Sequence, residues 1–445
     1  MPSPTEMTKM ELGRMPETHS TPTFREALGI WARIGLLSFG GPAAQIALMH
    51  RIIVDEKRWL SEPQYLNALS FCMLLPGPEA MQLATYAGWR LHGVVGGLAA
   101  GLLFVLPGAA VVLALSMIYA AYGNVAIVEA VFLGVKAAVL VIVIEALLRI
   151  SKRALTRGLH WALAGISFVA IFFLGLPFPL IIAIAAAIGF LEGRGAPEAT
   201  LDQTRVSVSV WHTLGVVTIW LAIWIAPLAV VTAIVGGDHV LAQLGWFFSK
   251  LALVTFGGAY AVLAYMGQDV VAHYGWLQAG QMLDGLGLAE TTPGPLILVT
   301  EFVGYLAAYT HGGAPPVGMG MAGAVVALWA TFVPCFLWIF AGAPYIEWII
   351  AQPRLRGALS AITAAVVGVI LNLAVWFALH VFFRNVELVH AGPLKLWLPD
   401  FATLDWRVVL LAGISAFLLL RRHWGIASVL GVASILSVII RQIGI

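Results

Sequence analysis

Two cations occupy matching positions in two copies of one sequence pattern. Arg33 lies five residues before Ser38, and Lys250 lies five residues before Thr255. A cation inside a hydrophobic segment costs several kcal/mol unless it has a partner or water, so we interpret the matched pair as one that holds an anion. The alternative is that both side chains extend to the membrane interface. The two hydroxyl groups could donate to the same anion or bond within their own helices.

Each copy also carries two motifs that interrupt a helix. They are Phe39-Gly40-Gly41-Pro42 and Pro76-Gly77-Pro78 in the first copy, and Phe256-Gly257-Gly258 and Pro293-Gly294-Pro295 in the second. Glycine and proline break helices, and freed backbone is tolerated in a membrane only where protein or water surrounds it. The N–H groups and positive dipole at such breaks favour anions. All these residues are candidate substrate-binding residues, with tight helix packing through glycine as the alternative.

Three carboxylates are candidates for carrying a coupling proton. Glu79 directly follows the first Pro-Gly-Pro motif, Glu290 lies just before the second, and Glu301 lies in the same hydrophobic block as that second motif. A carboxylate in a partly dry cavity can hold a proton near neutral pH. The alternative is an ion pair with a nearby cation such as Arg90 or His92.

Lys136 lies near the middle of a long apolar run, which makes it a functional candidate. The alternative is a structural ion pair with Glu129 or Glu145. In the alignment of the two copies, Asn67 overlies Asp284. Charge therefore breaks the internal symmetry, as an asymmetric coupling site would require.

The composition is that of a protein that crosses a membrane several times. Of 445 residues, 61% are hydrophobic and 10% are charged, against about 25% charged in soluble proteins. The net charge of +2 provides no basic patch for nucleic acid. Cys72 and Cys335 stand alone in apolar runs, which predicts buried side chains rather than a disulfide or metal site. We find no metalloprotease or hydrolase motif, so we expect no cofactor, no metal and no enzymatic activity.

Stretches of about 20 apolar residues divide the chain into six hydrophobic blocks, a connecting span and six further blocks. The first six lie at 24–54, 62–90, 93–121, 125–148, 158–174 and 177–191, the connecting span at 211–235, and the second six at 241–272, 280–309, 317–343, 357–383, 404–420 and 423–440. The polar segment 1–23 lacks the pattern of a secretory signal and is expected to be a disordered cytoplasmic tail. The segment 192–209 is expected to be a cytoplasmic linker.

The second series of blocks repeats the first. An offset of 217 residues aligns the helix breaks, and an offset of 227 aligns Lys136 with Thr363. The pattern predicts an all-α membrane protein with a first repeat at 24–191, a connecting transmembrane helix at 210–236 and a second repeat at 237–445.

The positions of Lys and Arg predict opposite orientations for the two repeats. Cytoplasmic loops are enriched in these residues, and they cluster at Arg149, Lys152, Arg153 and Arg157, at Arg354 and Arg356, and at Arg421 and Arg422. Counting blocks between these loops places the N-terminus in the cytoplasm and inverts the second repeat. The central site therefore lies between two inverted-topology repeats.

The first two blocks of each repeat could be broken spanning helices or re-entrant hairpins. The loop between them carries Arg51, Lys57 and Arg58 in the first repeat, whereas the stretch from Gln268 to Gly280 carries no Lys or Arg. Hairpins would place the first loop inside and the second outside, in agreement with the charge rule. We therefore favour hairpins.

Two long motifs resemble the chromate ion transporter family, and in particular its long, two-domain bacterial members. They are SFGGP followed by WL, LPGPEAMQLATYAGW and FVLPG in the first copy, and TFGGAYAVL followed by GWL, TTPGPL and VGY in the second. The resemblance covers 24–441 and implies an inner-membrane protein that exports chromate and confers chromate resistance, with sulfate as a competing look-alike. Ala259 replaces Pro42 and Leu296 replaces Glu79 in the second copy, which argues against a fully symmetric mechanism.

Together these patterns predict a secondary active, proton-coupled chromate transporter in which one repeat rocks against the other. The alternatives are a carrier or channel for sulfate or another tetrahedral oxyanion that moves chromate incidentally. The expected partners are chromate and membrane lipid, with no nucleic acid; a homodimer is an open alternative to a monomer. If the matched cations hold the anion, Arg33→Ala and Lys250→Ala should each abolish transport.

Overall fold

The computed structural model describes residues 22–123, 125–193, 209–256 and 259–443. The tail, most of the linker, and the candidate residues Gly257 and Gly258 lie outside these ranges. The described chain is almost entirely helical and confirms the expected all-α membrane architecture. Five of its helices are long and apolar enough to cross a membrane: Glu79–Tyr122, Ala126–Ala154, Val210–Val235, Pro316–Ala351 and Pro353–Phe382.

The helices follow the predicted blocks closely. The first repeat comprises α2 (Phe24–Leu37), α3 (Gly41–His50), the π-helix η1 (Arg51–Glu56), α4 (Glu62–Leu74), α5 (Glu79–Tyr122), α6 (Ala126–Ala154), α7 (Gly158–Phe172) and α8 (Phe178–Glu192). The connecting helix is α9 (Val210–Val235). Helix α5 is kinked at His92 and Gly93, whose backbone angles are not helical, and the kink separates the second and third predicted blocks.

The second repeat presents the same order of elements. It comprises α10 (Val240–Val254), α11 (Ala259–Gln268), η3 (Asp269–His273), α12 (Ala279–Thr291), η4 (Leu296–Leu298), α13 (Val299–His311), α14 (Pro316–Gly342), η5 (Ala343–Tyr345), α15 (Ile346–Ala351), α16 (Pro353–Phe382), β1 (Val386–Ala391), β2 (Leu394–Pro399), η6 (Phe401–Thr403), α17 (Trp406–Ala416), η7 (Phe417–Arg421) and α18 (Ile426–Gln442). The hydrophobic pattern gives no sign of the β1–β2 hairpin. It is antiparallel and interrupts the repeat between α16 and α17.

The first two blocks of each repeat are re-entrant hairpins, as favoured from the sequence. Lys57, which follows α3 and η1, has its Nζ 3.0 Å from Glu26 Oε1 at the start of α2. The end of this segment therefore lies beside its beginning, as in a hairpin. In the second repeat the rings of Phe247 and Trp276 are 5.6 Å apart, with the tip of α10 and α11 between them in sequence. The helix-breaking motifs form the hairpin tips.

The following helices form a second hairpin in each repeat. His92, at the kink that ends the first part of α5, contacts Pro22 O through Nε2 at 2.8 Å. His311, at the end of α13, contacts Trp276 O through Nε2 at 3.3 Å. Both hairpins of a repeat therefore start and end at one level, and their tips point toward the middle of the molecule.

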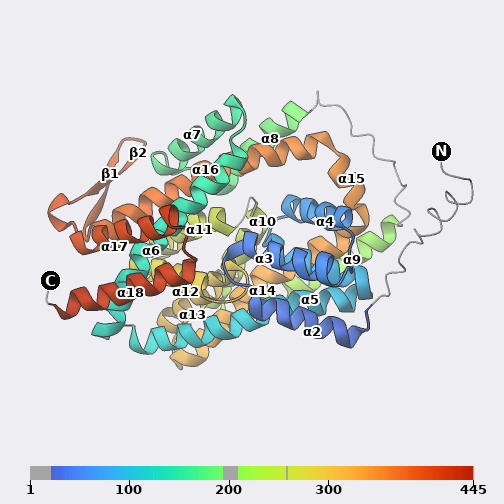
Figure 1. Ribbon diagram of the computed structural model, residues 1–445, viewed down its shortest axis with the longest axis horizontal. Coiled ribbons are helices and arrows are strands. Elements are labelled where there is room, and N and C mark those ends of the chain that lie inside the picture. Colours follow the sequence, from blue (N-terminus) through green and yellow to red (C-terminus); the bar gives the residue numbers. More distant parts are fainter. Residues whose placement is uncertain (1–21, 124, 194–208, 257–258, 444–445) are drawn as a thin grey trace, which may run out of the picture.

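The two pairs of hairpins start from opposite ends of the molecule. The ring of Phe24, in the base of the first pair, lies 5.5 Å from His92 at the kink of α5. Tyr119, near the other end of α5, donates a 2.8 Å hydrogen bond to Asp284 beside the base of the second pair. In Figure 1, α2, α4 and α15 lie at the right-hand end, and β1 and β2 at the left. The repeats are inverted relative to each other.

The outer helices of each repeat pack on the other repeat. Helices α7 and α8 pack along α16, whereas α17 and α18 pack along α6. The β1–β2 hairpin closes over the tip of the α7–α8 pair, where Lys395 N donates to Phe173 O at 2.6 Å. Because each long helix is covered by the outer helices of the other repeat, the two repeats form one packed body.

Candidate substrate-binding site

The four hairpin tips meet through hydrogen bonds that cross between the repeats. Gly77 N donates to Thr255 O at 2.8 Å, and Gly294 N donates to Ser38 O at 2.8 Å. The bonds are equivalent under the internal symmetry, and each joins a Pro-Gly-Pro tip to a Phe-Gly-Gly tip of the other repeat. Gly77 and Gly294 have φ values of 120° and 91°, which only glycine adopts without strain.

The Ser and Thr hydroxyls at the tips bond within their own helices. Ser38 Oγ donates to Ile34 O at 2.7 Å, and Thr255 Oγ1 donates to Leu251 O at 2.6 Å. Each hydroxyl carries one hydrogen, so neither donates to an anion in this arrangement. The intrahelical alternative holds for both residues.

Two buried glutamines that the sequence analysis did not single out brace the tips. Gln45 Nε2 donates to Gly294 O at 2.6 Å, and Gln82 Nε2 donates to Pro76 O at 2.7 Å. The Oε1 atoms of both side chains have no partner. Each glutamine follows a helix-breaking proline by three or four residues inside an apolar segment. A lone amide side chain in such a segment is the feature from which its role at the tips could have been predicted.

The other motif residues shape the tips. Gly40 adopts the left-handed conformation just before α3, and Pro42 occupies the first turn of that helix. Pro78 immediately precedes α5, and Pro295 immediately precedes η4. The remaining motif residues are Phe39, which is exposed, Gly41, which begins α3, Phe256, which is partly buried, and Pro293, whose carbonyl packs against Gly108.

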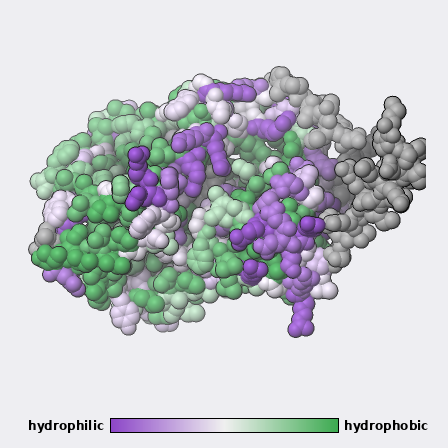
Figure 2. All heavy atoms as spheres, in the orientation of Figure 1, coloured by the Kyte–Doolittle hydropathy of each residue, from purple (hydrophilic) through white to green (hydrophobic). Residues whose placement is uncertain are grey.

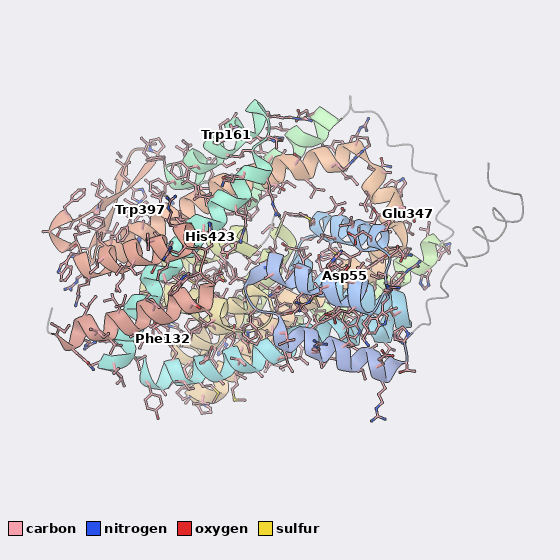
Figure 3. The ribbon with its side chains drawn as sticks, viewed as in Figure 1. Asp55, Phe132, Trp161, Glu347, Trp397 and His423 are labelled. Carbon is pink, nitrogen blue, oxygen red and sulfur yellow. The ribbon has the colours of Figure 1, made fainter. Side chains whose placement is uncertain are left out.

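A cavity of about 930 Å³ leads from one end of the molecule to the tips. Its inner wall includes Pro42, Gly77 and Glu79, and its outer wall includes Arg149 and Arg153 from the end of α6. The remaining lining comes mainly from α3, η1 and α4, and includes Asp55, labelled in Figure 3. In Figure 2, hydrophilic residues gather over the centre and right of this face, whereas its left-hand end is largely hydrophobic. Arg149 and Arg153 give the cavity the charge to attract an anion.

A second cavity, of about 890 Å³, reaches the same tips from the other side of the α6 end. It shares Arg149 and Arg153 with the first cavity and adds Lys152 and His423; Figure 3 labels His423. Its lining also includes Phe39, Gly40 and Glu290. Arginines that the sequence analysis used only to orient the chain therefore flank both routes to the tips.

The structure does not bring Arg33 and Lys250 to these cavities. Both side chains are exposed, on α2 and α10 respectively, and neither lines the two cavities. Extension to the membrane interface stays the alternative prediction for both side chains. Their role in binding stays a prediction.

The three candidate carboxylates have different surroundings. Glu79, the first residue of α5, lines the larger cavity, and among the described residues no ion pair joins it to Arg90 or His92. Glu290 is buried and accepts a 2.7 Å hydrogen bond from Tyr260 Oη. Glu301 is 1% exposed, and its Oε2 has no partner.

Lys136 pairs with a residue of the other repeat. Its Nζ lies 3.4 Å from Asp284 Oδ2. The expected alternatives, Glu129 and Glu145, were wrong, because these carboxylates pair with Arg441 and Arg149 at 3.5 Å each. Asp284 comes from α12, which packs on α6, and this approach of distant segments could not be read from spacing along one helix.

The residues that line the two cavities include groups that can attract an anion. Among the described residues, no group of three or more His, Cys, Asp or Glu side chains could hold a metal ion. Cys72 and Cys335 are buried and free, as predicted. The flanking arginines offer positive charge and hydrogen-bond donors to an anion.

Inverted repeats of re-entrant hairpins whose tips meet at backbone breaks are typical of membrane transport proteins. The chain belongs to the chromate transporter family, whose model matches residues 26–190 and 242–439. It is 34% identical over 348 residues to a chromate transport protein of Pseudomonas aeruginosa, covering 76% of this chain and 77% of that protein. It is 31% identical over 363 residues to a chromate transport protein of Cupriavidus metallidurans, covering 81% and 84%. A probable chromate transport protein of Synechococcus elongatus is also 31% identical, covering 80% and 85%. No solved structure matches the chain.

Proposed function

We propose that the protein exports chromate across the bacterial inner membrane by proton-coupled secondary transport and so confers chromate resistance. The carrying observation is the cation-lined cavity of about 930 Å³ that ends at the crossed hairpin tips. Arg149 and Arg153 lie in the last turns of α6, at the end that the charge rule assigns to the cytoplasm together with the N-terminus. A cavity open on the cytoplasmic side is the arrangement that loads a substrate for export.

The anion would sit where the two cavities converge on the tips. Chromate is a tetrahedral dianion, and the helices that follow the breaks at Gly40 and Gly77, which line one cavity each, present their N-termini from two directions. Arg149 and Arg153 flank both routes and raise the local concentration of anions. We keep Arg33 and Lys250 as candidates that would reach the substrate in another state of the cycle.

Glu79 is our first choice for the coupling carboxylate. It lines the cavity beside Gly77, and its counterpart in the second repeat is Leu296. A carboxylate on one side only can bind a proton when that side is open, which links proton movement to the state of the transporter. Glu290 and Glu301 are the other candidates, and both are buried.

Transport into proteoliposomes with imposed pH gradients tests this proposal. Chromate uptake should depend on the gradient in the unchanged protein and lose that dependence in Glu79→Gln. Uptake that is independent of the gradient would remove proton coupling, and absence of chromate uptake would remove the proposed substrate.

A carrier for sulfate or another tetrahedral oxyanion is the second candidate function. The same donors and cations suit any oxyanion of this shape. They contact its oxygen atoms and so do not distinguish chromium in chromate from sulfur in sulfate. Competition for labelled chromate uptake by sulfate and molybdate separates the candidates. Sulfate that competes at a lower concentration than unlabelled chromate would make chromate the incidental substrate.

A further inference from the structure

A charged cluster lies at the end of the molecule opposite the large cavity. Asp284 Oδ2 accepts a 2.8 Å hydrogen bond from Tyr119 Oη and lies 3.4 Å from Lys136 Nζ. Asp284 is 3% exposed, and its Oδ1 has no partner. The Lys136 side chain is 26% exposed. Three helices, α5, α6 and α12, thus meet at one ion pair, whose carboxylate is buried and has an unsatisfied oxygen.

The internal symmetry relates this cluster to the wall of the open cavity. Lys136 aligns with Thr363, and Asp284 aligns with Asn67. Thr363 lines the cavity of about 930 Å³, and Asn67 is exposed. The ion pair therefore occupies the position that, in the other repeat, is open to solvent.

Apolar side chains close the region around the ion pair. Met282 and Leu283 of α12 are 0% exposed, and Leu286 is 2% exposed. Gly267, the counterpart of His50 in the cavity wall, faces the side chains of Met282 and Phe377. When the transporter opens on this side, the hairpin that carries Asp284 must move away from α6, as its counterpart already has in the first repeat.

We propose that Lys136 is an oxyanion-binding residue on the exit side, and that Asp284 holds its place until that side opens. The inference rests on the proposed function for the identity of the oxyanion. In the closed state the Asp284 carboxylate satisfies the lysine; in the open state the transported anion replaces the carboxylate as its partner. Tyr119 Oη, which now donates to Asp284, is placed to donate to the same anion.

The energetics favour such an exchange over a permanent ion pair. A buried ion pair stabilises a protein little compared with apolar packing, but removal of one partner is costly. Opening without a replacement anion would leave Lys136 unpaired. Water can solvate the lysine once that side is open, but an oxyanion that binds Lys136 in the open state and not in the closed state stabilises the open state.

Cysteine labelling from outside the cell measures this opening. Leu286→Cys places a thiol in the closed region, and a membrane-impermeant maleimide reports its exposure; the parent protein, with buried Cys72 and Cys335, gives the background. Asp284→Asn, which imitates Asn67, should raise the labelling rate at least about tenfold, equivalent to about 1.4 kcal/mol.

Glu129→Gln is the matched control. It breaks the exposed Arg441 pair on the same helix α6 and should leave the labelling rate unchanged. An unchanged rate in Asp284→Asn, or an equal increase in Glu129→Gln, would overturn the proposed role of the ion pair.

A second pair of variants tests anion binding by Lys136 itself. Asp284→Asn and the double variant Lys136→Gln/Asp284→Asn both lack the ion pair and differ only in the lysine. Chromate added outside should protect the Leu286→Cys thiol in the first variant, and about tenfold more chromate should be needed in the second. Equal protection in both variants would show that Lys136 has only a structural role.

The exchanged pair Lys136→Asp/Asp284→Lys provides a check if the asparagine variant does not fold. It keeps the ion pair and should retain slow labelling, but it places the cation on the moving hairpin. Rapid labelling of this folded variant would contradict the proposal that the ion pair keeps the exit side closed. The labelling results do not require chromate transport. Failure of chromate uptake in proteoliposomes would therefore contradict the proposed function but not the role of the ion pair in keeping the exit side closed.

Discussion

The hairpins of the two repeats share one fold but differ in how tightly the rest of the protein covers them. Leu66 of α4 is 47% exposed, whereas its counterpart Leu283 of α12 is 0% exposed. On the facing long helix, Arg149 lines an open cavity, and its counterpart Trp376 is 1% exposed. The hairpins of the first repeat thus face an open cavity that Arg149 and Arg153 line. The hairpins of the second repeat are covered by aromatic and aliphatic side chains.

Under the proposed function, this difference corresponds to one repeat in an open arrangement and the other in a closed arrangement. If the open repeat closed as its counterpart has, and the closed repeat opened, the central tips would face the opposite side of the membrane. The residues are not exchanged symmetrically, however. Arginines line the cavity on the open side, whereas the Lys136–Asp284 ion pair lies on the closed side.

The largest expected effect comes from the feature that the two repeats share. Gly77→Ala and Gly294→Ala each place a Cβ at a positive φ, which costs on the order of 1–2 kcal/mol, and displace a tip that bonds to the other repeat. Both should abolish chromate uptake into everted vesicles while the protein stays in the membrane. Gly165→Ala, whose Cβ meets nothing within 4 Å, is the control. A harmless Gly294→Ala would show that the two tips are not equivalent.

The next effect concerns the open side alone. Arg149→Gln/Arg153→Gln removes the charge that the two cavities share and should raise the KM for chromate in everted vesicles about tenfold, because charge-assisted contacts contribute about 1.5–3 kcal/mol. Arg157→Gln, which breaks only the exposed pair with Glu192, should leave KM unchanged. An equal increase in KM for Arg157→Gln would show that the effect comes from the total charge of the protein and not from the position of Arg149 and Arg153 in the cavities.

A smaller effect is expected from the two matched cations. Arg33 and Lys250 are exposed and outside both cavities, so Arg33→Ala and Lys250→Ala should reduce export only if another state brings them to the substrate. Efflux rates in everted vesicles decide the point. Normal export by both variants would remove the two-cation site, and complete loss would show that the present state omits an essential part of the pathway.

The smallest effect concerns the start of α17, just after the β1–β2 hairpin that the first repeat lacks among its described residues. Asp405, the N-cap of α17, accepts hydrogen bonds from Arg407 Nε and Nη2 at 2.9 and 2.6 Å, and these bonds lower the pKa of Asp405. A lowered pKa gives stability that is present above the unfolded value of about 3.9 and is lost as pH falls through the folded value.

Asp405→Asn should therefore reduce the free energy of unfolding by about 1 kcal/mol at neutral pH and by less at acidic pH. Thermal unfolding of the purified protein at several pH values measures this change. A loss that is equal at all pH values would show that the charge of Asp405 does not contribute. Transport should change little, because Asp405 lies at the exit end, away from both cavities.

Local sequence features predicted the helices, but they did not predict the contacts between segments that are distant in sequence. The hydrophobic blocks, the repeat and the tip motifs depend on residues close in sequence, and the charge of Arg51, Lys57 and Arg58 correctly favoured hairpins. Spacing along one helix could not reveal that Lys136 pairs with Asp284, because that pair depends on how α12 packs on α6. The matched cations looked central for the same reason: alignment shows equivalence between positions, but not whether those positions face inward.

The crossed hydrogen bonds at the tips also constrain how the protein is made. The amide of Gly77 bonds to Thr255, which the ribosome adds only after the first repeat and the connecting helix are complete. Until then the first pair of hairpins has an incomplete tip inside the bilayer, where an unpaired N–H is costly. The first repeat must therefore wait in a provisional arrangement, and final assembly of the membrane domain is a late step that both repeats complete together.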